Sequence, residues 1–168
     1  MNMYFHLRAV PPPALRNSTT WLRKLFEDDW DSVRTRVDRH REEMLDRRYL
    51  DHDLLYAGAP PYQPEEEPCA QVILGGRPVF PAEQDKPPFL LLTAAQVSRV
   101  SDYLSSTDFG ALWHSARRDL LPRYGGAEVE PQTRGAFESA HRDLTAFYAR
   151  TAGYGDAVVK WLLIGPHR

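Results

Sequence analysis

Three segments with the character of β-strands stand far apart in this chain, and stretches with helical periodicity separate them. Residues 3–10 alternate between two faces, and residues 89–92 are four consecutive apolar residues. Residues 157–164 are apolar apart from Lys160. Dispersed strands bury their apolar faces only if they meet in one sheet that helices cover. We therefore expect an α+β fold, with a small mixed sheet of about three or more dispersed strands covered by several amphipathic helices.

A long charged stretch in the first third of the chain has helical periodicity. Ser18 is a suitable N-cap, and apolar residues then recur at helical spacing to about Arg48. A single helix of that length is unusual in a small domain, so we expect a break near residues 28–29. The helical stretch at about 29–48 carries charges of both signs, among them Glu43, on what should be its solvated face.

Four further helices are predicted from caps and spacing, one of which starts at Thr107 or Asp108. Residues 49–57 form a short helix that Gly58 closes, and Thr93 with Gln96 forms a capping box at the start of another. A long helix follows at about 133–152, with Gly153 as its C-cap. The intervening segments 58–68 and 120–131 are punctuated by proline and glycine and are predicted to be polar loops.

Size and charge limit the class of protein. The 168 residues fit a single domain spanning 1–168, with ordinary values of 42% hydrophobic and 26% charged residues. The net charge of −2 gives no reason to expect nucleic acid as a partner. No apolar stretch approaches the roughly 18 residues that a membrane span needs. The lone Cys69 fits a reducing cytoplasm, and the strong preference for Arg over Lys suggests a GC-rich bacterial genome.

No stretch of the sequence predicts a catalytic, metal or cofactor site. The six histidines form no metal-ligand motif, and residues 51–53, although titratable, point in different directions if they are helical. The glycine pairs lack the neighbours of a phosphate-binding loop, and there is no nucleophile elbow. We therefore assign no catalytic residues, no metal ligands and no cofactor.

Aromatic and titratable side chains near loops are the candidate binding residues, because Tyr and Trp are favoured in binding patches. The alternative is that most of them belong to the core. The candidates are Tyr49, His52, Asp53, Tyr56, Trp113 and Tyr124. Three other tryptophans fall on apolar stripes and are predicted to be core residues, namely Trp21, Trp30 and Trp161.

The order of these segments resembles the YfbM-like family, bacterial proteins that carry a domain of unknown function. The resemblance rests on the strand and cap of residues 89–97, the turn of residues 72–76 and the closing strand that begins at Ala157. It covers nearly the whole chain by order and spacing. It departs at Tyr49, where the family commonly has Trp, and near Tyr124, where the family's later Trp is absent. The resemblance implies an α+β fold and a cytoplasmic bacterial protein, and it implies no reaction.

The leading functional hypothesis is a non-enzymatic binding or regulatory accessory domain that recognises a protein or a small ligand through loops 58–68 and 120–131. An immunity-type inhibitor of a partner protein is one alternative. Another is an enzyme of unrecognised class with a pocket near His52, Asp53 and Tyr124. A third is self-association through the charged stretch at 29–48. The sequence leaves the oligomeric state open.

Overall fold

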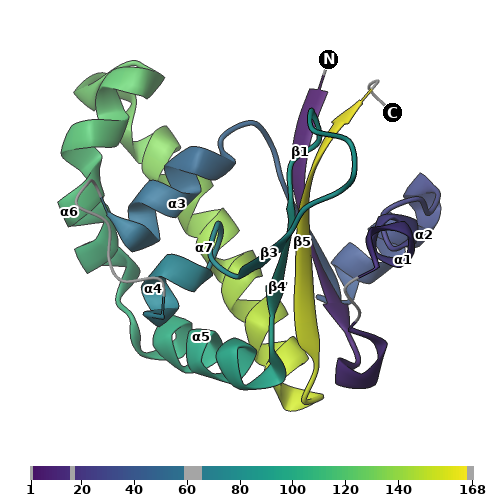
Figure 1. Cartoon of the computed structure of the whole chain (residues 1–168). Helices are drawn as coiled ribbons and strands as arrows, with labels where there is room; N and C mark the ends of the chain where they lie inside the picture. The colour runs from purple at the N-terminus through teal and green to yellow at the C-terminus, as the bar shows by residue number, and fades with distance from the viewer. Residues whose placement is uncertain (1, 16–17, 59–65, 166–168) are drawn as a thin grey trace.

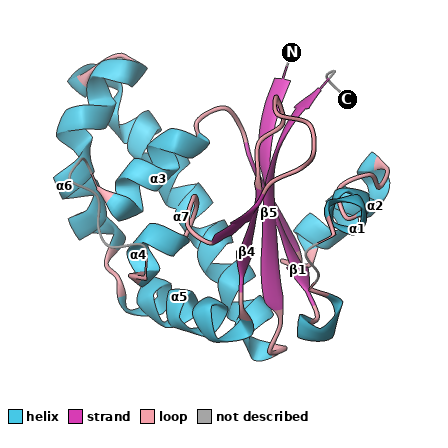
Figure 2. Cartoon of the chain, in the orientation of Figure 1, coloured by secondary structure: helices cyan, strands magenta, loops and turns pink. Residues whose placement is uncertain are grey.

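The computed structural model describes residues 2–15, 18–58 and 66–165. It has an α+β fold in which one open sheet lies between two unequal layers of helices (Figures 1 and 2). The predicted fold class is thereby confirmed. Part of the predicted loop 58–68 lies outside the described residues.

The described strands form a five-stranded sheet in the order β2-β1-β5-β4-β3. Their bounds are β1 (Asn2–Val10), β2 (Glu42–Leu45), β3 (Arg77–Val79), β4 (Phe89–Leu92) and β5 (Ala157–Gly165). All four pairings are antiparallel, so the expectation of a mixed sheet was wrong. The connection from β2 to β3 runs from one edge of the sheet to the other through α3 and α4.

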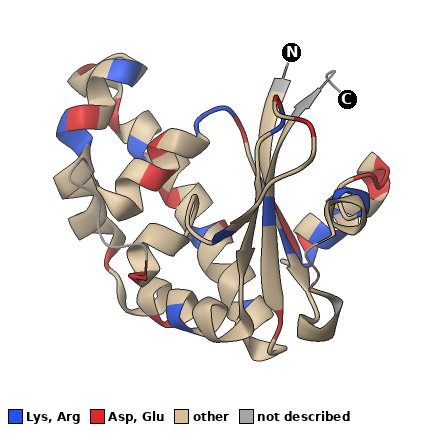
Figure 3. Cartoon of the chain, in the orientation of Figure 1, with Lys and Arg blue, Asp and Glu red and all other residues tan. Residues whose placement is uncertain are grey.

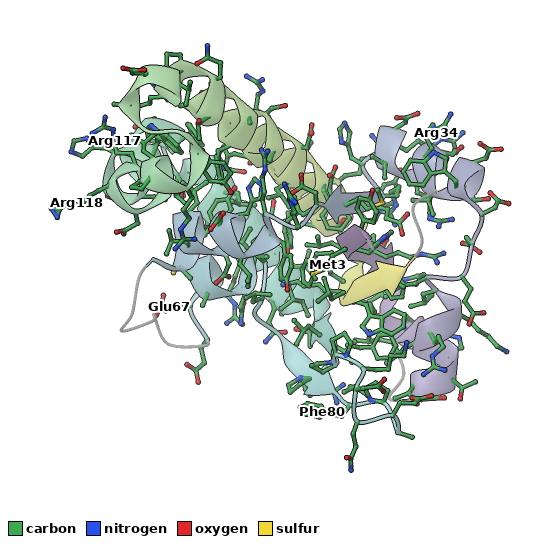
Figure 4. The ribbon with its side chains drawn as sticks, turned by 90° about the horizontal axis from the view of Figure 1, so that it is seen from above. Met3, Arg34, Glu67, Phe80, Arg117 and Arg118 are labelled. Atoms are coloured by element: carbon green, nitrogen blue, oxygen red, sulfur yellow. The ribbon has the colours of Figure 1, made fainter. Side chains whose placement is uncertain are left out.

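Among the described helices, two cover one face of the sheet and five cover the other (Figure 1). The first layer holds α1 (Thr19–Lys24) and α2 (Trp30–Asp38). The second holds α3 (Tyr49–Ala57), α4 (Pro68–Gln71), α5 (Ala94–Ser106), α6 (Phe109–Leu120) and α7 (Glu130–Gly153). Short 3-10 turns, η1 (Pro12–Ala14), η2 (Leu121–Tyr124) and η3 (Ala127–Val129), join them. Seen from above, the helices that carry Arg117 and Arg34 lie on opposite sides of the strand that carries Met3 (Figure 4).

Local capping chemistry explains where several helices begin and end. The Ser18 hydroxyl accepts a hydrogen bond from the Trp21 amide, and the capping box at the start of α5 is complete. Gly58 follows α3 with φ +81°, a conformation that residues with a Cβ rarely adopt. The predicted cap at Gly153 was one residue too early, because Gly153 is still helical, Tyr154 is the C-cap and Gly155 adopts φ +67°.

The charged stretch at 29–48 differs from its prediction in the second half. Helix α2 ends at Asp38, and residues 42–45 form the edge strand β2. Glu43, expected on a solvated helix face, is only 6% exposed, because it faces α7 from that strand. Trp30, expected in the core, is 40% exposed, because it is the first residue of α2 and its ring packs under Arg34.

Each face of the sheet has its own apolar cluster. The one beneath α3–α7 includes Leu7, Leu144 and Phe147, and the smaller one beneath α1 and α2 includes Phe89 and Trp161. Charged residues lie mainly on the helices and turns (Figure 3). None of the described helices has the length and apolar character needed to cross a membrane.

Candidate functional site

Lys160 lies at the middle of the central strand β5 and faces the larger helical layer. It stands in register with Leu7 of β1 and Leu90 of β4, and its exposed fraction is 0%. The Nζ atom donates hydrogen bonds to the carbonyl oxygens of Gln71 at 2.5 Å and Gly75 at 2.9 Å. Burial lowers the pKa of Lys160 to about 7, while the nearby Asp53 carboxylate opposes that shift. The lysine therefore ties the segment after α4 to the centre of the sheet.

Gly75 allows that segment to fold back tightly on α4. A Cβ at this position would lie 2.4 Å from the Ala70 carbonyl oxygen and 2.6 Å from Gln71 Cα, which is closer than real contacts permit. The next residue, Gly76, has φ +132° and packs against the backbone of Leu91 in β4. The glycine pair that the sequence indicated only as a turn is thus required by two close backbone approaches.

A cavity of about 810 Å³ lies above this segment, bounded by α3, α4 and β3. This volume is within the range of about 300–1,000 Å³ that is typical of small-molecule sites. Apolar side chains form much of its wall, together with four charged side chains and the amide side chains of Gln71 and Gln96. The lining includes Leu50, Asp53, Leu54, Ala57, Gly58, Glu66, Ala70, Leu74, Arg77, Pro78 and Arg123.

Asp53 supplies a carboxylate to the cavity from the last two turns of α3. Its Oδ1 atom accepts a hydrogen bond from the Leu74 amide at 3.4 Å. Burial raises the pKa of Asp53, whereas that amide and the Lys160 ammonium lower it. The carboxylate is thus held against a backbone amide and over the buried lysine, and no second reactive side chain among the described residues is hydrogen-bonded to it.

Arg123 reaches the rim of the cavity from η2, within the predicted loop 120–131. Its guanidinium donates to one oxygen of Asp51, and the Tyr124 hydroxyl donates to the other. Arg48 lies over the Tyr124 ring at 5.1 Å from its centroid. Tyr124 therefore helps to fix η2 against α3, while Arg123 faces the cavity.

His52 lines a different, smaller cavity of about 210 Å³ on the other side of α3. Its ring packs on Phe137 with centroids 4.6 Å apart, and burial lowers its pKa to about 4. Consecutive residues of a helix point about 100° apart, so His52 and Asp53 face different cavities. Tyr124 lines neither of these two cavities. Neither of these two cavities, among the described residues, brings together the three residues of the enzyme alternative.

The other aromatic candidates take part in packing. Tyr49 is half-buried and stacks on Phe5, with ring centroids 5.3 Å apart. Tyr56 is buried, and its hydroxyl is 2.9 Å from His141 Nδ1 in a hydrogen bond. Trp113 is buried and donates from Nε1 to Glu130 at 2.8 Å. None of these three lines the cavity beside Asp53.

Sequence reasoning missed Lys160, Arg77 and Arg123 as contributors to the site. Lys160 did carry a signal, because a lysine in an otherwise apolar, doubly covered strand must place its ammonium group among buried acceptors. The two arginines carried none, since neither lies in a motif and the fold alone brings them to one rim. Among the residues that the structure describes, no three His, Cys, Asp or Glu side chains are grouped to hold a metal ion.

Comparison with known families identifies the family of the chain. The sequence profile of the family described as "Domain of unknown function (DUF1877)" matches residues 1–161, and the chain belongs to that family. A solved structure similar to this chain is that of YfbM from Escherichia coli, described as a protein of unknown function. The two share 19% identity, with a TM-score of 0.60 over 97% of this chain and 100% of the other. That likeness shows the fold. Comparison with curated proteins gives no match.

Proposed function

We propose that this chain is a binding domain of the bacterial cytoplasm that takes up a small ligand in the cavity beside Asp53. The observation that carries the proposal is the cavity itself, because described residues from both predicted binding segments line it. Gly58 and Glu66 come from segment 58–68, and Arg123 comes from segment 120–131. The cytoplasmic setting is supported by the lone Cys69, and the bacterial origin by the preference for Arg over Lys.

Binding without catalysis fits the chemistry of the lining better than a reaction does. A nucleophile and its base must lie within hydrogen-bond reach of each other. Asp53 is instead bonded to the Leu74 backbone, and His52 faces away from this cavity. The apolar wall with a few polar groups suits recognition of a ligand that is fixed in orientation by two or three contacts.

A ligand screen monitored by amide chemical shifts of ¹⁵N-labelled protein tests the proposal. We expect hits to shift the amides of Leu54, Leu74 and Gly76, which surround the cavity. Ala70→Trp adds a large side chain to the lining and should abolish those shifts. Ala111→Trp, an equally large change at an exposed position of α6, is the matched control and should preserve them.

The proposal fails if no compound shifts these amides, or if hits bind Ala70→Trp as well as they bind the unchanged protein. It also fails if compounds perturb only the amides around His52. Formation of a stable complex with a partner protein that leaves the cavity amides unperturbed would favour the immunity-type alternative instead.

A further inference from the structure

We infer that the ligand of this cavity is a zwitterionic peptide of two or three residues, with its ammonium group at Asp53 and its carboxylate at Arg77. This inference rests on the proposed function, since it names the chemistry of the ligand for the same cavity. Four observations support it, namely the balance of charge, the separation of the two signs, the apolar wall and the volume.

The charges that line the cavity are balanced. Among its described lining residues, Asp53 and Glu66 are acidic, and Arg77 and Arg123 are basic. A polyanion such as a nucleotide would be repelled by the carboxylates, and a polycation would be repelled by the arginines. A neutral ligand that carries both signs at different ends is complementary to this arrangement.

The two signs come from different elements of the fold. Asp53 projects from α3, and the C-terminal end of that helix at Ala57 and Gly58 also lines the cavity. A helix C-terminus carries partial negative charge, so both features favour an ammonium group there. Arg77 begins the edge strand β3, a different element of the cavity wall. The ammonium and carboxylate of a bound ligand must therefore be separated by a spacer.

Arg77 is a better carboxylate partner than Arg123. Arg123 is already ion-paired with Asp51, whereas Arg77 has no ion-pair partner among the described residues. An exposed guanidinium without a partner retains its full capacity for a bidentate contact with a carboxylate. Arg123 then contributes to the rim without being the main contact of the ligand.

Apolar side chains also line the cavity. Leu50 is 55% exposed although it is a large aliphatic residue, and Leu54, Leu74 and Pro78 continue the same lining. An aliphatic side chain of the ligand would bury this surface. The volume of about 810 Å³ is large for one amino acid and suits two or three residues.

Addition of the peptide as an extra strand is less favourable, even though β3 is an edge strand. Its three residues include Pro78, which has no backbone N–H to donate to a neighbouring strand. Recognition should therefore depend on the two charged ends of the ligand more than on a ladder of backbone hydrogen bonds. Blocking either end is then the most informative change.

The test uses tripeptides with free ends and Leu, Val or Ala in the middle, together with versions that are N-acetylated, C-amidated or blocked at both ends. Isothermal titration measures affinity, and amide shifts locate the bound peptide. We expect the best free-ended peptide to bind in the cavity and each single block to weaken it about tenfold, as expected for loss of one charged hydrogen bond. The doubly blocked peptide should bind weakest.

Matched variants assign each end to its residue. Asp53→Asn should make binding insensitive to N-acetylation, and Arg77→Gln should make it insensitive to C-amidation. Arg99→Gln, at an exposed position on α5, should behave like the unchanged protein. The comparison of free and blocked peptides on the unchanged protein stands even if a variant fails to fold.

The outcomes separate this inference from the proposed function. Equal binding of free and blocked peptides overturns the inference. Failure of every tripeptide, with another compound still shifting the Leu54 and Gly76 amides, also overturns the inference and leaves the binding function standing. If no compound of any class shifts those amides, both fail.

Discussion

Two ionisable side chains are buried in one row of the sheet, and their surroundings differ. Glu43 of β2 and Lys160 of β5 both stand in register with Leu7, so only the width of β1 separates them. Lys160 is surrounded by acceptors, because two carbonyl oxygens and Asp53 face its ammonium group. Glu43 has Asp143 of α7 and Glu42 as neighbours, and burial together with these charges raises its pKa to about 8.

Burial of an ionisable group therefore has opposite consequences at Lys160 and at Glu43. The lysine satisfies backbone groups and thereby supports the wall of the cavity beside Asp53. The glutamate is kept protonated near neutral pH, since the Met44 amide that stabilises its carboxylate is outweighed by burial. We therefore expect substitution of Lys160 to lower the free energy of unfolding. Removal of the charge of Glu43 should raise it.

Gly75→Ala should have the largest effect on stability, because it disrupts the tight turn after α4 whose carbonyl oxygens accept hydrogen bonds from Lys160. The new Cβ would meet backbone atoms of Ala70 and Gln71, which cannot move as a flexible side chain can. We expect the free energy of unfolding to fall by about 3 kcal/mol in urea titrations. Gly153→Ala, in helix α7 with no atom within 4 Å of the added Cβ, should instead stabilise by roughly 0.5 kcal/mol. Equal effects of the two changes would contradict the close approach.

Lys160→Met should have the next largest effect, with a loss of about 2 kcal/mol at pH 7, because the Gln71 and Gly75 carbonyls lose their donor. The lowered pKa of Lys160 means that the native state holds its proton less tightly than the unfolded chain. The native state therefore loses this proton at a lower pH than the unfolded chain does, and the free energy of unfolding rises between about pH 7 and pH 10. The deficit of the variant should grow over that interval, as measured by urea unfolding at several pH values.

Lys24→Met is the control for that change, since Lys24 is exposed on α1. It should alter the free energy of unfolding by less than about 0.5 kcal/mol at every pH. A variant at Lys160 that is as stable as the unchanged protein would show that the two carbonyls do not depend on the ammonium group.

Glu43→Gln should have a smaller effect of opposite sign. A carboxyl group whose pKa is raised in the folded state contributes stability below its unfolded value of 4.5, and that contribution is lost as pH rises toward about 8. Glutamine does not titrate, so the variant should not lose stability in this way. At pH 8 it should be more stable than the unchanged protein by roughly 1–3 kcal/mol. The two proteins should be equally stable at pH 4. Parallel stability profiles from pH 4 to pH 8 would refute the protonated state of Glu43.

Sequence patterns predicted the elements that have strong local signals and failed where tertiary contacts decide. Strands β1, β4 and β5 and the caps at Ser18 and Thr93 follow from periodicity and capping chemistry. Strand β2 was missed because Glu42 and Glu43, typical of a helix surface, are buried at the sheet edge by α2 and α7. Strand β3 was missed because three residues that include a proline carry almost no strand signal.

The candidate site was predictable only in part. The sequence indicated two candidate binding segments and Asp53, and Gly58, Glu66 and Arg123 of these segments border the cavity with Asp53. The sequence could not show that Asp53 and His52 face different cavities, because this depends on which face of α3 packs against Phe137. The convergence of Arg77 and Arg123 depends on long-range topology, which no local pattern encodes.

The central claim is that the cavity between α3, α4 and β3 is where this protein binds its ligand. A crystal structure of the protein with a hit from the amide-shift screen tests this claim most directly. The account predicts the ligand between Asp53 and Arg77, in contact with Leu54, with the hydrogen bonds from Lys160 to Gln71 and Gly75 intact. A ligand bound beside His52 on the opposite side of α3, with this cavity empty, would contradict it.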